Sequence, residues 1–205
     1  MRASALALAL AAGLSLPALA QMPQLPAVPQ LPVQIPGAPA AAPAAAPAPV
    51  ARAGGTFVNR DGREIGTVAL VEGPRGVAIN IQIREGGLLP GRKGIHIHSV
   101  GTCADGAAGF VASGAHLGAP GLAHGLLNAT GDYGDLPNLI VHRDGSVEVE
   151  MFSTLVSIGG VSGRGTLLDA DGAAFVVHQN PDDHTSQPIG GAGPRVACAT
   201  VQRQN

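Results

Sequence analysis

Short runs in which apolar and polar residues alternate, separated by turn dipeptides, limit the folds open to this chain more than any other feature. Between residues 77 and 84, valine and isoleucine alternate with smaller or polar residues, the period-2 pattern of a strand with one buried face. Asp-Gly pairs, which favour tight hairpin turns, stand at 61–62, 144–145 and 171–172. The strand candidates are residues 55–60, 63–71, 77–84, 95–98, 138–142, 146–152, 167–168, 173–178 and 195–201. We therefore predict an all-β fold, a Greek-key barrel or sandwich of about eight antiparallel strands.

Two long stretches do not fit as strands, residues 101–137 and residues 179–194. Loops of this length in a compact domain usually carry function. Four of the seven histidines lie in these stretches or at their edges. We therefore look for the functional site there.

The N-terminus has the features of an export signal over residues 1–20. Arg2 supplies a positive charge, an apolar run follows, and Ala18-Leu19-Ala20 forms a small-x-small cleavage site. The apolar run is short for a membrane span, which needs about 20 residues. We expect export to the periplasm, cell envelope or extracellular space, and an uncleaved N-terminal anchor remains the alternative.

Residues 21–53 consist mainly of Pro, Ala, Gln, Val and Leu. Repeated prolines favour extended, unpaired backbone, so we interpret this stretch as a disordered spacer. A low-complexity leader without a role is the alternative. Residues 54–205 then have the size of one domain.

Composition narrows the core and the partners. The chain has four Phe, one Tyr and no Trp, so the core must be aliphatic. The net charge is −2, and −3 without Arg2, with no basic cluster. We therefore expect no nucleic-acid partner.

Two cysteines, Cys103 and Cys198, are present in a chain expected to be exported. In an oxidising compartment they are predicted to pair. Free thiols or metal ligation are the alternatives.

The histidines offer a metal site. His96 and His98 stand at i and i+2 of a predicted strand and so point to the same face. Alone, such a pair is weak evidence. His116, His124 and His178 add further imidazoles, and Asp132 and Asp135 add carboxylates. Copper(II) prefers several imidazoles, whereas a mixed His and Asp set suits zinc, so the chain has enough ligands for two sites.

Five motifs, in order, resemble those of the exported bacterial copper/zinc superoxide dismutases. They are Gly94-Ile95-His96-Ile97-His98-Ser99-Val100-Gly101-Thr102-Cys103, Gly114-Ala115-His116, Gly134-Asp135-Leu136-Pro137, Phe175-Val176-Val177-His178 and Arg195-Val196-Ala197-Cys198. The similarity extends over almost all of residues 55–201.

The resemblance implies a role for each matching residue. His96, His98, His116 and His178 would hold copper, and His116 would bridge to a zinc bound also by His124 and Asp135. Asp182 would link a copper histidine to a zinc histidine, Arg195 would bind the substrate anion, and Cys103 would pair with Cys198.

One position departs from the family pattern. Asp132 stands where bacterial members have a third zinc histidine, and a one-residue shift of the alignment would place Tyr133 there instead. An aspartate can ligate zinc, but two carboxylates make a more anionic site. His142 and His184 match no ligand position.

The resemblance implies a superoxide dismutase that converts superoxide to dioxygen and hydrogen peroxide at copper. His116 would supply a proton and Arg195 would attract the anion. The alternatives are a copper-binding or copper-delivery domain of the same fold and a structural domain that has lost its metals. Superoxide is the expected partner, and a homodimer and a membrane attachment through an uncleaved signal stay open.

Overall fold

A computed structural model describes residues 51–204 of the chain. The predicted signal and most of the predicted spacer lie outside the described residues. Strand β1, Ala51–Asn59, begins three residues before the predicted start of the domain. Arg52 pairs with Val71 on one side and Gln204 on the other, and Ala53 is fully buried. The last three residues assigned to the spacer are therefore part of the sheet, because pairing with both neighbours and burial outweigh their composition.

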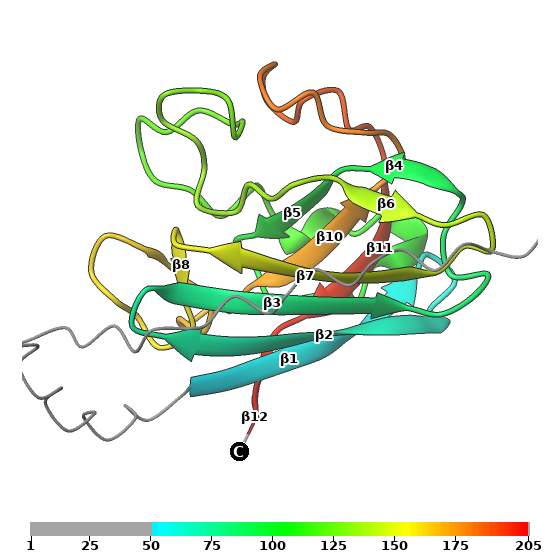
Figure 1. The fold of residues 1–205 in the computed structure, drawn as a ribbon, viewed down its shortest axis with the longest axis horizontal. Helices are drawn as coiled ribbons and strands as arrows, with labels where there is room; N and C mark the ends of the chain where they lie inside the picture. Colours follow the sequence, from blue (N-terminus) through cyan, green and yellow to red (C-terminus); the bar gives the residue numbers. More distant parts are fainter. Residues whose placement is uncertain (1–50, 205) are drawn as a thin grey trace, which may run out of the picture. The chain divides into compact units, whose positions relative to one another are not determined.

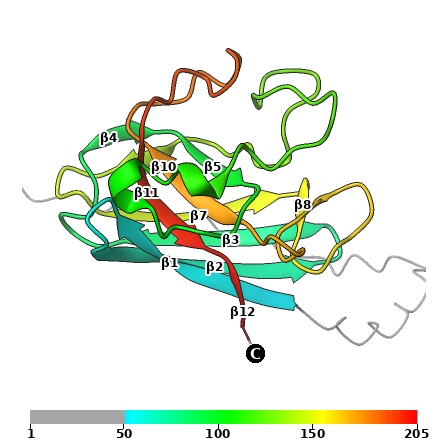
Figure 2. The ribbon, with the colours of Figure 1, turned by 180° about the vertical axis from the view of Figure 1, so that it is seen from behind.

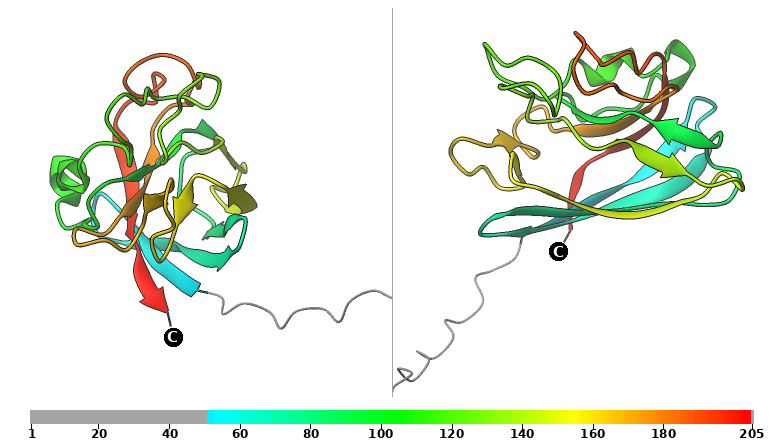
Figure 3. Two further views of the ribbon diagram at one scale, coloured as in Figure 1. Left: turned by 90° about the vertical axis from the view of Figure 1, so that its left-hand side faces the viewer. Right: turned by 45° about the horizontal axis from the view of Figure 1, so that its top comes forward.

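The main sheet has eight strands and is antiparallel throughout, in the order β5-β10-β11-β1-β2-β3-β7 with β12 also paired to β1 (Figure 1). Its strands after β1 are β2 (Glu64–Gly73), β3 (Gly76–Ile83), β5 (Ile95–His98), β7 (Val147–Ser153), β10 (Ala174–His178), β11 (Arg195–Thr200) and β12 (Gln202–Gln204). Seen from the end, the sheet curls around a central core (Figure 3). The predicted all-β barrel is confirmed.

Two small sheets complete the fold. Strands β4 (Gly91–Lys93) and β6 (Leu139–Val141) pair antiparallel, whereas β8 (Val156–Ser157) and β9 (Gly165–Thr166) pair in parallel. The predicted strand at 167–168 is wrong, because these residues follow β9. The Asp-Gly pair at 171–172 does not form a hairpin, because β9 pairs with β8 and β10 pairs with β5 and β11. The carboxylate of Asp169 accepts both backbone N–H groups of this turn.

The core is aliphatic, as predicted. The alternating residues of β3 (Val77, Ile79, Ile81 and Ile83) are all buried. A second, smaller cluster lies on the other face of β10 and contains Phe110, Ala174, Val176 and Cys198. Alternate residues of β10 are therefore buried in two different cores, one inside the barrel and one beneath the first long loop.

Both long loops lie on the same side of the barrel, above β5 and β10 in Figures 1 and 2, although they leave these antiparallel strands at opposite ends. The first connects β5 to β6 and contains the 3₁₀ turns η1 (Gly106–Ala108) and η2 (Val111–Ser113). The second connects β10 to β11. They contact each other directly, since the side chain of Gln187 hydrogen-bonds the backbone N–H and carbonyl of His124. Among the described residues, no helix is long and apolar enough to cross a membrane.

Candidate metal centre

Strand β5 presents the His-x-His pair beside the first long loop. The loop returns along β5, with bridges between His96 and Asp135 and between His98 and His116. On the other edge of β5, His96 pairs with Val176 of β10, the strand that ends at His178. Side chains far apart in sequence are thereby brought together by backbone pairing, in a region where His96, His98 and His178 are at most 1% exposed.

Four histidines form one cluster. His96, His98, His116 and His178 each offer a ring nitrogen, and these nitrogens lie within 4.8 Å of one another. The ring centroids of His96 and His116 are 4.1 Å apart, and those of His96 and His178 are 4.8 Å apart. These are the four residues that the resemblance assigns to copper.

In three of these rings, the protein engages one nitrogen and leaves the other free. His98 Nδ1 lies 2.9 Å from the Gly114 carbonyl, and His178 Nδ1 lies 2.8 Å from the Gly193 carbonyl. A carbonyl only accepts, so each Nδ1 carries the proton and each Nε2 has its lone pair free. In His96 the roles of the two nitrogens are exchanged: Nε2 lies 2.8 Å from the Asp182 carboxylate, and Nδ1 has no hydrogen-bond partner in the described part of the chain. This arrangement fixes the tautomers that metal ligands need.

The environment also keeps three of the imidazoles neutral. Burial is the main cause that lowers the pKa of His98 to about 3, with a smaller effect of the Arg195 charge, and burial beside the other histidines lowers the pKa of His116 to about 2. Burial is again the main cause for His178, whose pKa falls to about 4. A neutral imidazole is the form that binds a metal ion, so these rings are ready to do so near neutral pH.

A second group adjoins the first and shares His116. Its members are His116, His124, Asp132 and Asp135, whose donor atoms also lie within 4.8 Å of one another. His116 Nδ1 lies 3.5 Å from Asp132 Oδ2 and 3.8 Å from Asp135 Oδ1, and His124 Nδ1 lies 2.7 Å from Asp135 Oδ1. Burial and the nearby Asp135 charge raise the pKa of Asp132. Tyr133 packs against the barrel core instead, so the structure brings Asp132 to this group.

Asp182 connects the two groups. One carboxylate oxygen lies 2.8 Å from His96 Nε2, and the other lies 3.1 Å from His124 Nε2. Burial alone would raise the pKa of Asp182, but hydrogen bonds from His96, the His184 backbone and His124 together hold it well below its usual range. The carboxylate therefore stays ionised and orients one imidazole of each group.

A family model described as copper/zinc superoxide dismutase matches residues 64–201. The chain belongs to the copper/zinc superoxide dismutase family. A relative named superoxide dismutase (Cu-Zn) from Caulobacter vibrioides is 47% identical over 144 residues, covering 69% of this chain and 80% of its own length. Superoxide dismutase (Cu-Zn) 2 from Aquifex aeolicus is 34% identical over 148 residues, covering 71% of this chain and 84% of its own.

The same barrel occurs in solved structures. The crystal structure of a SOD-like protein from Bacillus subtilis superposes with a TM-score of 0.65 at 33% identity, covering 72% of this chain and 96% of that chain. Family membership, the fold and the Cys103–Cys198 disulfide predicted from the sequence are thereby confirmed.

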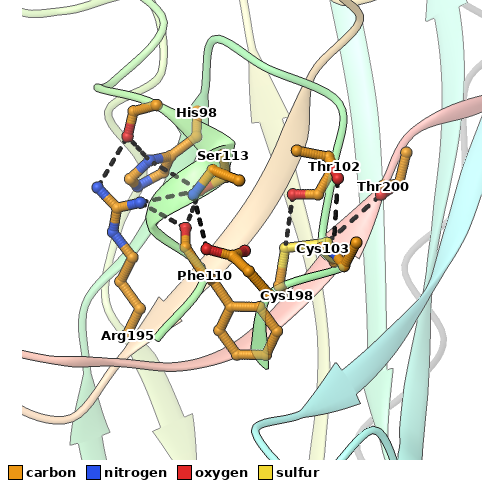
Figure 4. The surroundings of a disulfide bond; sticks show 12 residues. His98, Thr102, Cys103, Phe110, Ser113, Arg195, Cys198 and Thr200 are labelled. Carbon is orange, nitrogen blue, oxygen red and sulfur yellow. Dashed lines mark hydrogen bonds between the residues drawn. A yellow bond between two sulfur atoms is a disulfide. The ribbon is translucent and has the colours of Figure 1, made fainter. Parts of the chain in front are cut away.

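In this member of the copper/zinc superoxide dismutase family, the disulfide lies beside Arg195 (Figure 4). The Arg195 guanidinium donates to the Phe110 carbonyl at 2.6 Å, to Ser113 Oγ at 3.0 Å and to the Gly114 carbonyl at 2.7 Å. Gly114 is also the acceptor of His98 Nδ1, so Arg195 and the first histidine group share one carbonyl.

A cleft of about 610 Å³ leads to His116, which both metal groups share, and to His124 and Asp132 of the second group. Its polar side chains are His116, His124, Asp132, Gln187 and Arg195, and small or apolar residues of the long loops line the rest. A smaller cleft of about 300 Å³ is lined by Arg60, His178 and Arg195, among others. The metal groups are therefore buried but accessible to a small anion.

Several residues that position the site were missed in the sequence. The side-chain amide of Gln187 hydrogen-bonds both the backbone N–H and the carbonyl of His124. The side-chain amide of Asn138 does the same with the backbone of Asp182. Phe110 adopts φ of +57° so that its ring is buried under the disulfide while its carbonyl faces Arg195. All three lie in loops or at their edges, where no periodicity signals a side chain's direction.

Proposed function

We propose that this chain is a superoxide dismutase with copper as its redox centre and zinc in the adjoining site. The observation that carries the proposal is the convergence of four imidazoles beside the guanidinium of Arg195. The family and its named relatives support the activity. The copper-delivery alternative is not favoured, because the Caulobacter and Aquifex relatives are named superoxide dismutases and Arg195 adjoins the histidines.

The first histidine group fits copper. His96 Nδ1, His98 Nε2, His116 Nε2 and His178 Nε2 are buried nitrogens with no hydrogen-bond partner among the described residues. A buried polar atom without a partner is costly, so four of them facing one another need an explanation. A copper ion, which prefers imidazole ligands, provides one.

The second group fits zinc. In a tetrahedral zinc site with bonds of about 2.0–2.1 Å, the donor atoms lie roughly 3.3 Å from one another. His116 Nδ1 lies 3.5 Å from Asp132 Oδ2 and 3.8 Å from Asp135 Oδ1, close to that spacing. These distances support Asp132, despite its shorter side chain, and we propose it as the fourth ligand with His116, His124 and Asp135.

Copper supplies reversible one-electron chemistry, through which two superoxide anions and two protons become dioxygen and hydrogen peroxide. Arg195 binds the anion. A guanidinium has five N–H donors, and three of those of Arg195 are engaged by Phe110, Ser113 and Gly114. Two donors remain for superoxide, on a side chain whose orientation its three acceptors fix.

His116 is the proposed proton donor. Its two ring nitrogens are buried and without hydrogen-bond partners among the described residues, and it belongs to both metal groups. The ring therefore has nitrogens free of protein partners in this part of the chain, so it could take up a proton and pass it to a peroxide product.

The deciding experiment is superoxide decay by pulse radiolysis, with the purified protein loaded first with copper and then with copper plus zinc. We expect rapid, copper-dependent decay that His178→Ala abolishes, because a copper ligand is lost. The control is His142→Ala, an exposed histidine outside both metal groups. Equal rates for His178→Ala and the parent would exclude this copper site.

The zinc assignment has its own test. Asp132→His should raise zinc affinity by restoring a third imidazole, measured by competition with a chromophoric chelator. Asp183→His, at an exposed neighbouring position in the second loop, is the control. If zinc affinity is the same in Asp132→His and the parent, position 132 is not a ligand position.

We also propose that the protein is exported, with residues 1–20 as a signal and residues 21–53 as a spacer whose last three residues belong to β1. The disulfide supports export, because such bonds persist in oxidising compartments. Cell fractionation with and without residues 1–20 is the test: retention of both forms in one compartment would exclude the signal. Light scattering would decide between monomer and homodimer.

A further inference from the structure

His184 lies outside both metal groups but beside the carboxylate that connects them. It is in the second long loop, two residues after Asp182, and its side chain is 17% exposed. Its Nδ1 atom is buried, has no hydrogen-bond partner within residues 51–204, and lies 3.4 Å from Asp182 Oδ2. The contact is attractive if Nδ1 carries the ring proton and repulsive if Nδ1 presents its lone pair to the carboxylate.

The orientation of Asn138 can be derived from the backbone. The Asp182 N–H can only donate, and it donates to Asn138 at 2.8 Å, so the receiving atom is Oδ1. The other amide atom is therefore Nδ2, which donates to the Asp182 carbonyl at 2.8 Å. Both contacts agree, so the Asn138 amide has one orientation.

That orientation fixes the tautomer of His184. Asn138 Nδ2 lies 3.0 Å from His184 Nε2, and since an amide nitrogen only donates, Nε2 must accept. A neutral imidazole that accepts at Nε2 carries its proton on Nδ1. The Nδ1–H group then faces Asp182 Oδ2, the same oxygen that His96 Nε2 approaches at 2.8 Å.

We propose that His184 is a positioning residue, whose Nδ1–H, fixed by Asn138, orients the Asp182 carboxylate between His96 and His124. The inference rests on the metal site proposed above. The carboxylate then has a nitrogen neighbour on every side: His96 Nε2 and His184 Nδ1 at one oxygen, and His124 Nε2 and the His184 backbone at the other.

The backbone of His184 has a separate role. Its N–H donates to Asp182 Oδ1 at 2.6 Å, and its carbonyl accepts from Leu127 at 3.1 Å. Any residue could make these two contacts. At φ of +63°, glycine would make them with less strain than histidine. The imidazole therefore adds only the contact to Asp182 and the hydrogen bond from Asn138.

The first test needs no mutation. Nitrogen-15 NMR of the zinc-loaded protein with copper(I), which is diamagnetic, distinguishes protonated from unprotonated ring nitrogens. We expect His184 with a protonated Nδ1 and an unprotonated Nε2 near neutral pH. Protonation at Nε2 would overturn the proposal. The measurement does not involve superoxide, so its result is independent of whether the protein is a dismutase.

The second test separates the side chain from the backbone. His184→Gly keeps both backbone contacts and removes the imidazole. Loss of an outer partner of a metal ligand typically weakens binding 10- to 100-fold, so we expect zinc release to a chelator to be roughly tenfold faster. The copper(II) EPR spectrum should also change, since His96 shares Asp182. His142→Gly is the control for removing an imidazole.

The zinc-release rate and the EPR spectrum of His184→Gly distinguish a role of the imidazole from a role of the turn alone. Zinc release from His184→Gly at the parent rate, or slower, with an unchanged EPR spectrum would show that His184 serves only the turn, and would overturn the proposal. Should this variant fail to fold, Asn138→Asp tests the same contacts, from Asn138 to His184 and from His184 to Asp182. A second carboxylate oxygen facing His184 Nε2 should move the proton to Nε2, and an unmoved proton would contradict the role of Asn138.

Discussion

Gly190 shows how closely the second loop is fitted to the metal centre at the scale of one residue. Its φ is +58°, and a Cβ atom there would overlap Asp182 Oδ1 and lie 3.0 Å from His124 Nε2. Gly191 also has positive φ, +71°, but a Cβ atom there would meet nothing within 4 Å. The two adjacent glycines therefore differ in steric surroundings while sharing a backbone requirement.

Substitution of these glycines separates the two effects. Gly191→Ala should cost about 1 kcal/mol of stability, the usual penalty for an L side chain at positive φ. Gly190→Ala should cost more, and should also weaken zinc binding at least tenfold, because Asp182 and His124 must move. Thermal unfolding and zinc competition measure the two quantities. Equal zinc affinity in both variants would contradict the close fit.

At the scale of elements, the disulfide joins the first loop to β11 and supports the anion site. Cys198 is fully buried, pairs with Val58 and Val176, and belongs to the cluster that covers the Phe110 ring. The loop it closes spans 95 residues. Since the Phe110 carbonyl accepts from Arg195, the bond stabilises the fold and the acceptors of Arg195 together.

Removal of the disulfide tests both roles. Cys103→Ser with Cys198→Ser should lower the free energy of unfolding by roughly 4–5 kcal/mol, the chain-entropy value for a loop of this length. Urea unfolding measures this effect. Superoxide turnover should fall even where the variant is fully folded, because Phe110 no longer holds Arg195. A folded variant with parental turnover would contradict the second role.

Strands were more predictable than loops, for a physical reason. The alternation in β3 and the glycine turns at 62 and 145 are local signals, and both appear in the structure. The start of β1 at Ala51 depends on pairing with β2 and with β12, near the far end of the chain, so composition alone misplaced it. The parallel β8–β9 pair likewise has no local signature.

In the candidate site, too, residues with a local sequence signal were predictable and residues that act through long-range contacts were not. The spacing of His96 and His98 on a strand and the resemblance to the family together predicted the histidines and aspartates that the structure brings together. Asn138 and Gln187 were not named, because their roles are hydrogen bonds to the backbone of residues more than 40 positions away. Such contacts exist only once both loops are in place.

At the scale of the molecule, the buried histidines predict a pH-dependent stability of the metal-free protein. The folded pKa values of His98, His116 and His178 are about 3, 2 and 4, whereas unfolded histidine titrates near 6.5. Above pH 6.5 all three are neutral in both states, and their contribution to stability is complete. Below it, only the unfolded chain binds protons, so stability falls as pH falls.

Each imidazole removes up to about 1.4 kcal/mol per pH unit in this window. We expect the free energy of unfolding of the metal-free protein to be up to about 4 kcal/mol lower at pH 5.5 than at pH 7.5. Urea unfolding at the two pH values measures it. Unchanged stability would mean that these imidazoles are protonated in the folded protein.

The charge distribution of the whole chain predicts how superoxide approaches. Neither long loop contains a lysine or arginine, and the chain carries a net charge of −2. Arg195 is therefore the one cation among the residues that line the larger cleft, and it acts at short range. The larger cleft therefore has no second cation for long-range attraction, which salt would screen over about 10 Å at 0.1 M.

Raising the ionic strength should consequently leave the rate of superoxide decay unchanged or increase it slightly, because salt screens the repulsion by the net negative charge. Ala119→Lys places a cation at the larger cleft, and should both raise the rate and make it fall with salt. Pulse radiolysis from 0.01 to 0.15 M salt compares the two proteins. A steep fall with salt in the parent would show that cations outside the cleft guide the anion, and that the approach is not controlled by Arg195 alone.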